Sequence, residues 1–517
     1  MESKTGDDGP DPGAATAPRR GRFRRGRPAP AAPAYVTRRI PTYDLLDEES
    51  LVRVEDAAET ILQEVGIEIR GDDEALGLFR GAGADVDGHR MRLPRGLARS
   101  LCATAPRRFT QHARNPARTV DMGGDAVVFV PAYGSPFVHD LAGGRRYGTL
   151  ADFENLVRLI YMIPTLHHSG GTVCEPVDIP VNKRHLDMVY AHLRHSDKAL
   201  LGSVTTASRA ADSIAMCRLV FGDERMERDC VIMGNVNANS PLVWDGEVSR
   251  VIRTYAAANQ GVVVAPFILG GAMGPATTPG AVALSHAEAM VGVALTQLQR
   301  PGAPAVYGNF LSSTALRSGA PTFGTPEPAL GSLVVGQLAR RLGVPLRCSG
   351  AFTSSKLPDG QAMQESALSL MAAILCGGNF LFHAAGWLEG ALTMGYEKLV
   401  MDADMLGAMA TYLGGLTIDD DQLALDAIRE VGPGGHFLGT GHTLAHCGTA
   451  FWETGLADVA SFEQWQDGGG KDHARRAHER WQAMLAEYQA PAMDPAVDEA
   501  LRDFMDRRKA ALPDAWH

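Results

Sequence analysis

The sequence lacks the features that mark several large classes of protein. No apolar run reaches the roughly eighteen uninterrupted residues of a membrane-spanning helix, so we expect no membrane span. The net charge of −11 argues against a general nucleic-acid binder, because phosphate binding needs a basic surface. The seven cysteines include no CxxC pair, which indicates reduced thiols in a cytoplasmic protein and not a disulfide framework. With 45% hydrophobic and 21% charged residues, the 517-residue chain has the composition of a soluble globular enzyme.

The first 35 residues stand apart in composition. Asp, Gly, Pro and Ala dominate them, and the stretch RRGRFRRGRPAPAAPA carries six arginines. Its twin arginines resemble an export signal, but Pro and Ala follow in place of the apolar region that such a signal needs. We therefore predict that residues 1–35 form a disordered tail, and a role in docking an acidic partner stays open.

Eight short apolar runs, rich in β-branched residues, recur from residue 125 onward. They span residues 125–134, 165–173, 198–206, 230–238, 261–269, 304–311, 345–352 and 379–386. Helix-like patterns fill the gaps, and this alternation predicts a parallel sheet that is covered by helices. Eight units over about 260 residues match an α/β fold of the (β/α)8 TIM-barrel type. An open doubly wound sheet is the alternative, but no GxGxxG motif follows an early strand.

The segments on either side complete the predicted architecture. Residues 36–120 contain a helical pattern with an acidic first turn and are expected to form an N-terminal α/β cap. The barrel is assigned to residues 121–390. Residues 391–517 are mostly helical in pattern, and we expect a C-terminal extension that completes the barrel mouth.

Aromatic residues are frequent where the predicted strands end. In a TIM barrel, functional residues lie at the C-terminal ends of the strands and in the loops after them. Such positions hold Tyr133, Phe310, Phe352 and Trp387, and the extension adds Phe437. Because aromatic faces bind quaternary ammonium groups, these rings predict a pocket for an organic cation. Ordinary packing is the alternative for each ring.

Polar side chains at the strand ends are the other candidates. They are His168, Glu175, Asn235, Lys356 and His383. Asn235 begins a run of amides at positions 235, 237 and 239, which a continuing strand would present on one face. Turn chemistry after the strand is the alternative. Lys356 is a candidate partner for a carboxylate, and Asp359 in the same loop is predicted to be the N-cap of the next helix.

Residues 430–446 read EVGPGGHFLGTGHTLAH and combine three histidines with five glycines. His442 and His446 would share a helix face, but position 443 is Thr, so the Glu of a zinc-protease HExxH motif is absent. A GxxxxGK[ST] phosphate loop is also absent. We therefore expect no catalytic metal bound by this chain. Residues 432–435 are predicted to form a compact turn that presses His436 and Phe437 toward the barrel mouth.

The stretch VGPGGHFLGTGHTLAH resembles the trimethylamine methyltransferase family of corrinoid-dependent methyltransferases. Supporting stretches are LQEVGIEI (62–69), SGGTVCEPVDIP (169–180) and TSSKLPDGQAMQES (353–366). The resemblance runs from about residue 40 to about residue 490 and implies a TIM barrel, in agreement with the strand count. It also implies a place in methylamine metabolism.

The resemblance implies an amine:corrinoid protein Co-methyltransferase. In such an enzyme, a methyl group on an amine nitrogen passes to the Co(I) corrinoid of a separate small protein, so this chain itself would bind no cofactor tightly. The founding members contain pyrrolysine, whereas this chain has standard residues only. A quaternary ammonium needs no such activation, because it is already cationic and its leaving group is a neutral amine. The resemblance to non-pyrrolysine members therefore implies a quaternary or tertiary amine such as glycine betaine as the substrate.

The resemblance also implies roles for single residues. Four aromatic rings, Tyr133, Phe310, Phe352 and Trp387, would surround the trimethylammonium group. Lys356 or a histidine at the mouth would meet the substrate carboxylate, and His383 and His436 would line the surface where the corrinoid protein docks. The candidate catalytic residues are Lys356, His383 and His436. The candidate substrate-binding residues are Tyr133, His168, Glu175, Asn235, Phe310, Phe352, Trp387 and Phe437.

Other functions stay open at this point. One is a binding or regulatory barrel that recognises a quaternary amine without methyl transfer. Another is methyl transfer directly to a pterin, and a third is a barrel that acts on an unrelated small substrate. We also expect a homo-oligomer.

Overall fold

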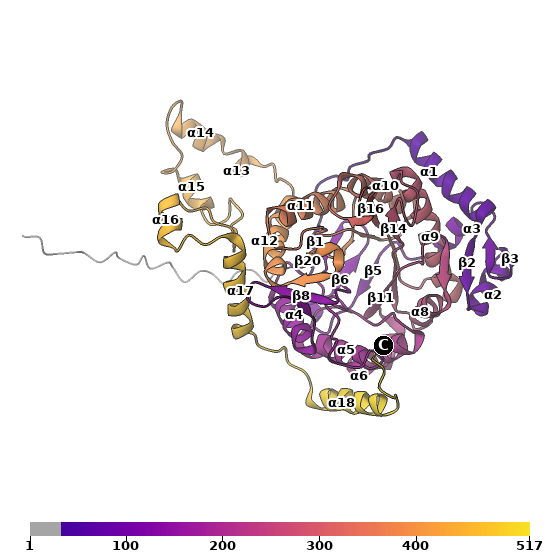
Figure 1. Cartoon of the computed structure of the whole chain (residues 1–517). Helices are drawn as coiled ribbons and strands as arrows, with labels where there is room; N and C mark the ends of the chain where they lie inside the picture. Colours follow the sequence, from indigo (N-terminus) through magenta and orange to yellow (C-terminus); the bar gives the residue numbers. More distant parts are fainter. Residues whose placement is uncertain (1–32, 517) are drawn as a thin grey trace, which may run out of the picture. The chain divides into compact units, whose positions relative to one another are not determined.

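A curled eight-stranded sheet organises the fold (Figure 1). The computed structural model describes residues 33–516, so the predicted tail lies almost entirely outside the described residues. β1 (Val36–Thr37) pairs antiparallel with one edge of the sheet, and the other seven strands are parallel. Their order after β1 is β7 (Ala126–Phe129), β19 (Phe380–Leu381), β18 (Leu346–Cys348), β15 (Ala305–Gly308), β13 (Gly261–Val264), β11 (Ile232–Val236) and β10 (Leu200–Leu201).

Residues 166–169 join the two parallel edges of this sheet. The His167 N–H donates to the carbonyl oxygen of Phe129 on β7 at 3.0 Å, and the Ser169 N–H donates to that of Ala199, next to β10, at 2.8 Å. His168 and Ala199 form a parallel bridge. Hydrogen bonds therefore link neighbouring segments around a ring to which each of the eight apolar runs contributes. The mixed α/β class predicted from the sequence is confirmed, and the curled sheet agrees with the predicted barrel.

Lys198 holds the joining segment in place. Its buried ammonium donates to three carbonyl oxygens, those of Ile160 at 2.6 Å, Ile163 at 2.8 Å and Leu166 at 2.6 Å. Ile160 belongs to the last turn of α4 (Leu150–Met162), where carbonyl groups lack partners within the helix. A cation is also favourable at this negative end of the helix dipole. Lys198 thus ties the end of α4 to the segment that completes the ring.

Helices surround the ring of strands (Figure 1). They are α4, α5 (Arg184–His195), α6 (Ala207–Phe221), α8 (Gly246–Ala257), α9 (Thr278–Gln299), α10 (Pro326–Leu342), α11 (Gly360–Leu375) and α12 (Tyr396–Leu413). Within the described part of the chain, α9 alone is long and apolar enough to cross a membrane. However, 94% of its most apolar window is buried in the protein, which is the environment of a core helix.

The N-terminal segment packs a small sheet and three helices against the outside. The helices are α1 (Glu48–Thr60), α2 (Asp73–Gly81) and α3 (Leu97–Cys102), and the strands are β2 (Ile67–Arg70), β3 (Asp85–Asp87) and β4 (Arg90–Arg92). The acidic first turn of α1 contains Glu48 and Glu49, and its N-cap Asp47 accepts from the Ser50 N–H at 2.9 Å. The small sheet takes its fourth strand, β12 (Val243–Asp245), from the loop after β11. The segment is therefore bound to the barrel through backbone pairing.

The C-terminal segment is mostly helical. Its helices are α13 (Asp420–Leu423), α14 (Leu425–Val431), α15 (Gly441–His446), α16 (Phe462–Asp467), α17 (His473–Glu487) and α18 (Pro495–Ala510). The short helices α13–α16 project from the side of the ring, whereas α17 lies along α12 (Figure 1). On α12, the buried carboxylate of Glu397 lies 2.7 Å from Nδ1 of His478 and accepts from Nε1 of Trp481 at 3.0 Å. These polar contacts fix α17.

Lys198→Met is expected to lower the free energy of unfolding by roughly 2–4 kcal/mol, because three buried carbonyl groups lose a charged donor. Urea denaturation followed by circular dichroism measures the change. Lys471→Met is the matched control, since the Lys471–Glu479 ion pair is exposed and should contribute less than about 1 kcal/mol. Equal losses in the two variants would contradict the role given to Lys198.

Three buried histidines predict acid lability. Burial lowers the pKa of His167 and His286 to about 3 and that of His192 to about 4. Unfolded histidine has a pKa of about 6.5, so the unfolded chain binds more protons below that pH, and stability falls as the pH falls. Together the three should contribute about 4 kcal/mol per pH unit between about pH 6 and pH 4.5.

The slope is measured from urea midpoints at several pH values. His286→Gln should reduce the contribution of these histidines by about one third. A slope that His286→Gln does not change would show that His286 is already protonated in the folded protein.

Candidate functional site

Aromatic side chains gather where β15, β18 and β19 end. Phe310 begins β16 (Phe310–Ala315), directly after β15 and Asn309, and Trp387 begins β20 (Trp387–Leu388). Ring centroids are 5.1 Å apart for Phe310 and Phe352, 4.7 Å for Phe352 and Trp387, and 5.9 Å for Phe310 and Trp387. The His383 ring lies 4.7 Å from that of Trp387 and 5.5 Å from that of Phe310. The structure thus brings four of the candidate residues together.

Two further rings extend this group. Phe323 lies 5.4 Å from Trp387 and 6.0 Å from Phe352, and it comes from a loop with no strand or helix pattern that would have singled it out. We call Phe310, Phe323, Phe352, His383 and Trp387 the aromatic cluster. Tyr133 joins it indirectly, because its ring lies 5.4 Å from that of Phe382, which stacks on His383 at 4.4 Å.

The ends of β18 and β19 are locked together by the backbone. The Ala351 N–H donates to the carbonyl oxygen of His383 at 2.8 Å. A Cβ atom at Gly350 would lie 2.3 Å from the carbonyl carbon of His383, so this close approach requires glycine. His383 itself has a positive φ of 63°, which is uncommon for a residue with a side chain. The backbone therefore fixes the direction of the His383 ring.

The loop after β18 folds around two carboxylates. Glu365 of α11 accepts from Thr353 Oγ1 at 2.5 Å and from the Ser354 N–H at 2.8 Å. Asp359 accepts from the Ala362 N–H at 3.0 Å, which confirms the predicted N-cap. Lys356 is left on the surface, where its ammonium donates to the Ser354 carbonyl oxygen at 2.9 Å.

A buried ion pair supports the turn before Trp387. The side chains of Lys398 and Asp402, one turn apart on α12, are fully buried and form a hydrogen-bonded pair. Asp402 also accepts from the Gly386 N–H at 2.9 Å, and Lys398 donates to Ser366 Oγ of α11 at 2.9 Å. Burial lowers the pKa of Lys398 and raises the pKa of Asp402. The pair links two helices to the backbone that carries Trp387.

Arg347, in the middle of β18, is a buried cation beside the aromatic cluster. Its guanidinium carbon lies 5.1 Å from the ring centroid of Phe310 and 5.4 Å from that of Phe382, and Nη1 donates to the carbonyl oxygen of Asn309. Burial lowers the pKa of Arg347 to about 10, so the side chain stays protonated at neutral pH. Across residues 33–516, no carboxylate lies within ion-pair distance of it.

Several buried polar atoms near Arg347 also lack a hydrogen-bond partner within the described part of the chain. They are Nε of Arg347, Nδ1 of His383 and Nδ2 of Asn309, and Oδ1 of Asn235 on β11 is likewise without a partner. An unsatisfied buried polar group costs about 1–3 kcal/mol, so such a group calls for a partner that the protein does not supply. Burial, and then the charge of Arg347, hold the pKa of His383 well below its usual range. A neutral histidine and an unpaired guanidinium suit a ligand that carries an anionic oxygen.

Sequence reasoning missed Arg347, although a signal for it was present. Its run, PLRCSGAF, places one arginine in the middle of an otherwise apolar strand. A cation in a strand that is covered on both sides must be buried, and buried charges mark functional positions.

The remaining strand-end candidates have partners or positions of their own. Both ring nitrogens of His168 are engaged, Nε2 with Gln111 Oε1 at 3.1 Å and Nδ1 as acceptor from the Gly170 N–H at 2.9 Å. Glu175 pairs with Arg184 at 2.5 Å, and burial raises the pKa of this carboxyl group. Asn235 is buried at the end of β11, but residues 237 and 239 are exposed. Of the two alternatives for the three amides, the structure agrees with turn chemistry, because the strand ends at Val236.

The glycine-rich stretch lies apart from the aromatic cluster. Gly432 and Gly434 have the predicted positive φ values, 64° and 81°, and Thr440 caps α15 by accepting from the Thr443 N–H at 3.2 Å. His436 and Phe437 are exposed in the projecting segment, and no aromatic contact within residues 33–516 joins either ring to the cluster.

Comparison with known proteins assigns the chain to a family. The family described as Trimethylamine methyltransferase (MTTB) matches residues 16–513. The chain belongs to the trimethylamine methyltransferase family. The family membership that the sequence motifs indicated is therefore confirmed.

The relatives differ in their named substrates. The chain is 40% identical over 470 residues to a glycine betaine methyltransferase of Desulfitobacterium hafniense (strain Y51), which covers 91% of this chain and 98% of the relative. It is 27% identical over 463 residues to the trimethylamine methyltransferase MttB of Desulfitobacterium hafniense (strain DSM 10664 / DCB-2), which covers 89% and 92%. Among solved structures, the Methanosarcina barkeri monomethylamine methyltransferase (MtmB) matches with a TM-score of 0.47 and 13% identity over 87% of this chain and 95% of that one.

Lys398→Met is expected to destabilise the protein by about 3–5 kcal/mol, because it leaves Asp402 as a buried carboxylate without its cation. The double variant Lys398→Met with Asp402→Asn should lose less than Lys398→Met alone, since the amide keeps an acceptor for the Gly386 N–H without a charge. Urea denaturation of the single and double variants gives the coupling energy. Additive losses would mean that the two groups are not paired.

Proposed function

We propose that this protein transfers a methyl group from a quaternary amine of the glycine betaine class to the corrinoid of a partner protein. The observation that carries the proposal is the buried, unpaired Arg347 beside the aromatic cluster. Membership of the family and the 40% identity to a glycine betaine methyltransferase support the reaction type and the substrate class.

A betaine is a zwitterion, and the site offers complementary groups for both of its charges. Ring faces of the aromatic cluster attract the trimethylammonium group through their negative quadrupoles. The Arg347 guanidinium, as a fork of parallel donors, suits the carboxylate. His383 is neutral at pH 7 because burial and Arg347 depress its pKa, so it adds no charge that repels the substrate nitrogen.

Arg347 and Lys356 are alternative partners for the substrate carboxylate. Arg347 is buried against the cluster, where an ion pair is only weakly screened by water. Lys356 is exposed and already donates to a backbone carbonyl group. Burial and position favour Arg347, and the variants below separate the two residues.

For the proposed methyl transfer, the protein needs mainly to bind the quaternary ammonium substrate and to remove water from it. The carbon–nitrogen bond breaks with its electron pair moving to nitrogen, so the leaving group is a neutral tertiary amine that needs no proton. The corrinoid, when bound to its own protein, supplies the nucleophile for the methyl carbon. This chain fits that division of labour, because the aromatic cluster has no acidic side chain of its own and excludes water from the reacting cation. The corrinoid partner, a cytoplasmic location and a homo-oligomer remain part of the proposal.

Arg347→Met should weaken glycine betaine binding by about 30- to 100-fold, because a charged hydrogen-bonded contact contributes about 2–3 kcal/mol. Binding of tetramethylammonium, which has no carboxylate, should stay within about threefold, since methionine restores much of the packing volume. Isothermal titration calorimetry measures both ligands. Lys356→Ala is the control and should change neither affinity. If Lys356→Ala loses betaine binding and Arg347→Met keeps it, Lys356 is the carboxylate partner.

Methyl transfer is tested with the reduced corrinoid partner protein and glycine betaine, through the visible spectrum of the corrinoid. Phe352→Ala should slow the transfer by at least about tenfold, because the ring contacts both Phe310 and Trp387. Tight betaine binding by the unmodified protein without any spectral change would support a binding or regulatory barrel in place of the transferase.

A further inference from the structure

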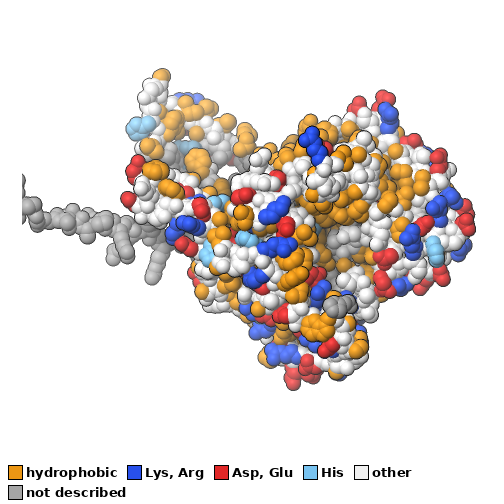
Figure 2. Space-filling model, in the orientation of Figure 1, with side chains coloured by type: hydrophobic (Ala, Val, Ile, Leu, Met, Phe, Trp, Pro, Cys, Tyr) orange, Lys and Arg blue, Asp and Glu red, His pale blue; other side chains and the backbone are white. Residues whose placement is uncertain are grey.

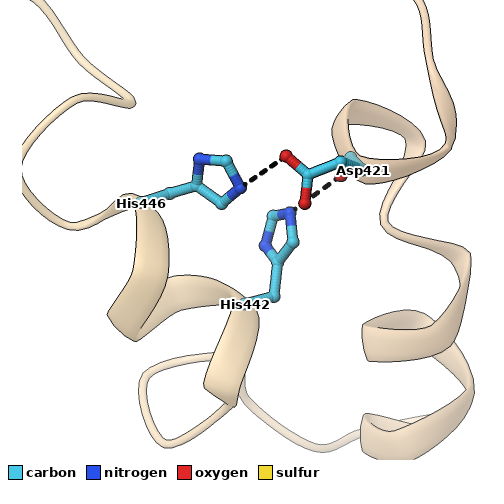
Figure 3. A group of neighbouring side chains, drawn as sticks. All are labelled: Asp421, His442 and His446. Carbon is cyan, nitrogen blue, oxygen red and sulfur yellow. Dashed lines mark hydrogen bonds and ion pairs between the residues drawn. The ribbon is translucent and has the colours of Figure 1, made fainter.

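Two short helices of the projecting segment bring three metal-ligating side chains together. Asp421 belongs to α13, and His442 and His446 stand four residues apart on α15 (Figure 3). Nε2 of His446 lies 3.0 Å from Oδ2 of Asp421, and Nε2 of His442 lies 3.0 Å from the Asp421 carbonyl oxygen. The two imidazole rings are 4.4 Å apart. Both rings therefore face the same aspartate from one side of α15.

The spacing of these donors fits one small cation. One ligand atom from each side chain lies within 4.8 Å of the other two. Donors bound at about 2.0–2.2 Å to a tetrahedral ion lie roughly 3.3–3.6 Å apart. The ligand atoms would therefore have to move together by less than about 1.5 Å, through side-chain rotation, to bind one ion. Two imidazole nitrogens and one carboxylate oxygen suit zinc and its neighbours in the first transition series, whereas calcium and magnesium prefer oxygen donors alone.

The surroundings favour a cation and leave room for a further ligand. Asp419 and Asp420 precede Asp421 in the chain, so the site carries excess negative charge. A hollow of about 490 Å³ opens beside the group, and Asp421, Glu430 and His442 line it. A water molecule in this hollow would complete four-coordination, as in zinc sites with three protein ligands.

The helices of the segment are short and bury little apolar surface. α13 and α15 have four and six residues, too few for independent stability. Many of its large apolar side chains face solvent, as the orange atoms at the upper left of Figure 2 show. Leu416, Leu438 and Leu444 are 91%, 86% and 76% exposed. Segments that bury so little apolar surface are commonly stapled by a structural metal or a disulfide.

We propose that Asp421, His442 and His446 bind one divalent transition-metal ion of the zinc class, which fastens α13 to α15. The ion has a structural role. It lies apart from the aromatic cluster, and position 443 is Thr where a zinc protease has its catalytic Glu. This inference does not depend on the proposed function, since neither Arg347 nor any ring of the cluster takes part in it.

Cobalt(II) is the spectroscopic probe for this site. The full chain, purified without a histidine tag and freed of metal, is titrated with Co²⁺ at pH 7.5, and the visible absorption of the ion is recorded. We expect one ion per chain, displaced by stoichiometric Zn²⁺. Asp421→Asn and His446→Ala should each weaken binding by more than about tenfold, and affinity should be lower in acid, because protons compete with the metal for its ligands.

Matched controls separate this site from other ligands on the chain. His89→Ala removes an exposed histidine elsewhere and should leave the titration unchanged. Cys447→Ser removes the exposed thiol next to His446 and should leave the cobalt spectrum without change. Zn²⁺ should also slow proteolysis within residues 414–470 of the unmodified protein but not of Asp421→Asn, which reports on the clamp without any use of activity.

Either of two results would overturn the proposal. One is the absence of stoichiometric Co²⁺ or Zn²⁺ binding at micromolar concentration. The other is binding that survives both Asp421→Asn and His446→Ala. In the first case the three side chains form only a hydrogen-bonded contact, and in the second the ion binds elsewhere.

Discussion

The barrel depends on polar side chains that complete a ring of very short strands. β10 and β19 contain two residues each, and residues 166–169 are held mainly by the hydrogen bonds at their two edges. Lys198 stabilises these residues by donating hydrogen bonds to three carbonyl oxygens at and before the start of the segment. Asn379 lies just before β19 and links the two strands beside it. Its side chain accepts from the Leu346 N–H on β18 and donates to the carbonyl groups of Gly124 and Ala126 near β7. The ring of strands determines where each strand ends, and the aromatic cluster lies at those ends. Lys198 and Asn379 therefore also help to position the cluster.

The buried arginine sets the chemistry of those strand ends. A guanidinium without a carboxylate is unfavourable in an interior, because burial removes its hydration and no counter-charge replaces it. The ring faces of Phe310 and Phe382 and one carbonyl group recover part of the loss. In the proposed function the same residual charge would favour an incoming carboxylate, since the desolvation has already occurred in the folded protein. The proposed function therefore predicts that Arg347 affects both stability and binding.

The sequence predicted the ring because each strand is a continuous apolar run, the pattern of a sheet covered on both faces. It also predicted Phe310, Phe352 and Trp387 as neighbours, together with Tyr133, since one rule places strand ends of a barrel on a common face. His383 was expected with His436 at the docking surface of the corrinoid protein. Other features follow from tertiary packing and have no local signal. Phe323 reaches the cluster from an irregular loop, and the amides at 237 and 239 turn outward because the strand stops at Val236. Periodicity cannot show where a strand ends when polar residues follow it directly.

The burial of the aromatic cluster is uneven. Phe352, His383 and Trp387 are almost fully enclosed, whereas Phe310 is only partly buried and packs against Phe267 at 4.8 Å. Among the five residues of the cluster, Phe310 is therefore the most exposed, at the point where β16 begins. His436 and Phe437 of the glycine-rich stretch are exposed on the projecting segment, and within residues 33–516 no aromatic contact joins either ring to the cluster. The aromatic cluster and the projecting segment thus differ in what holds them. The rings at the strand ends are buried in the core, whereas the projecting segment keeps its shape with little core of its own.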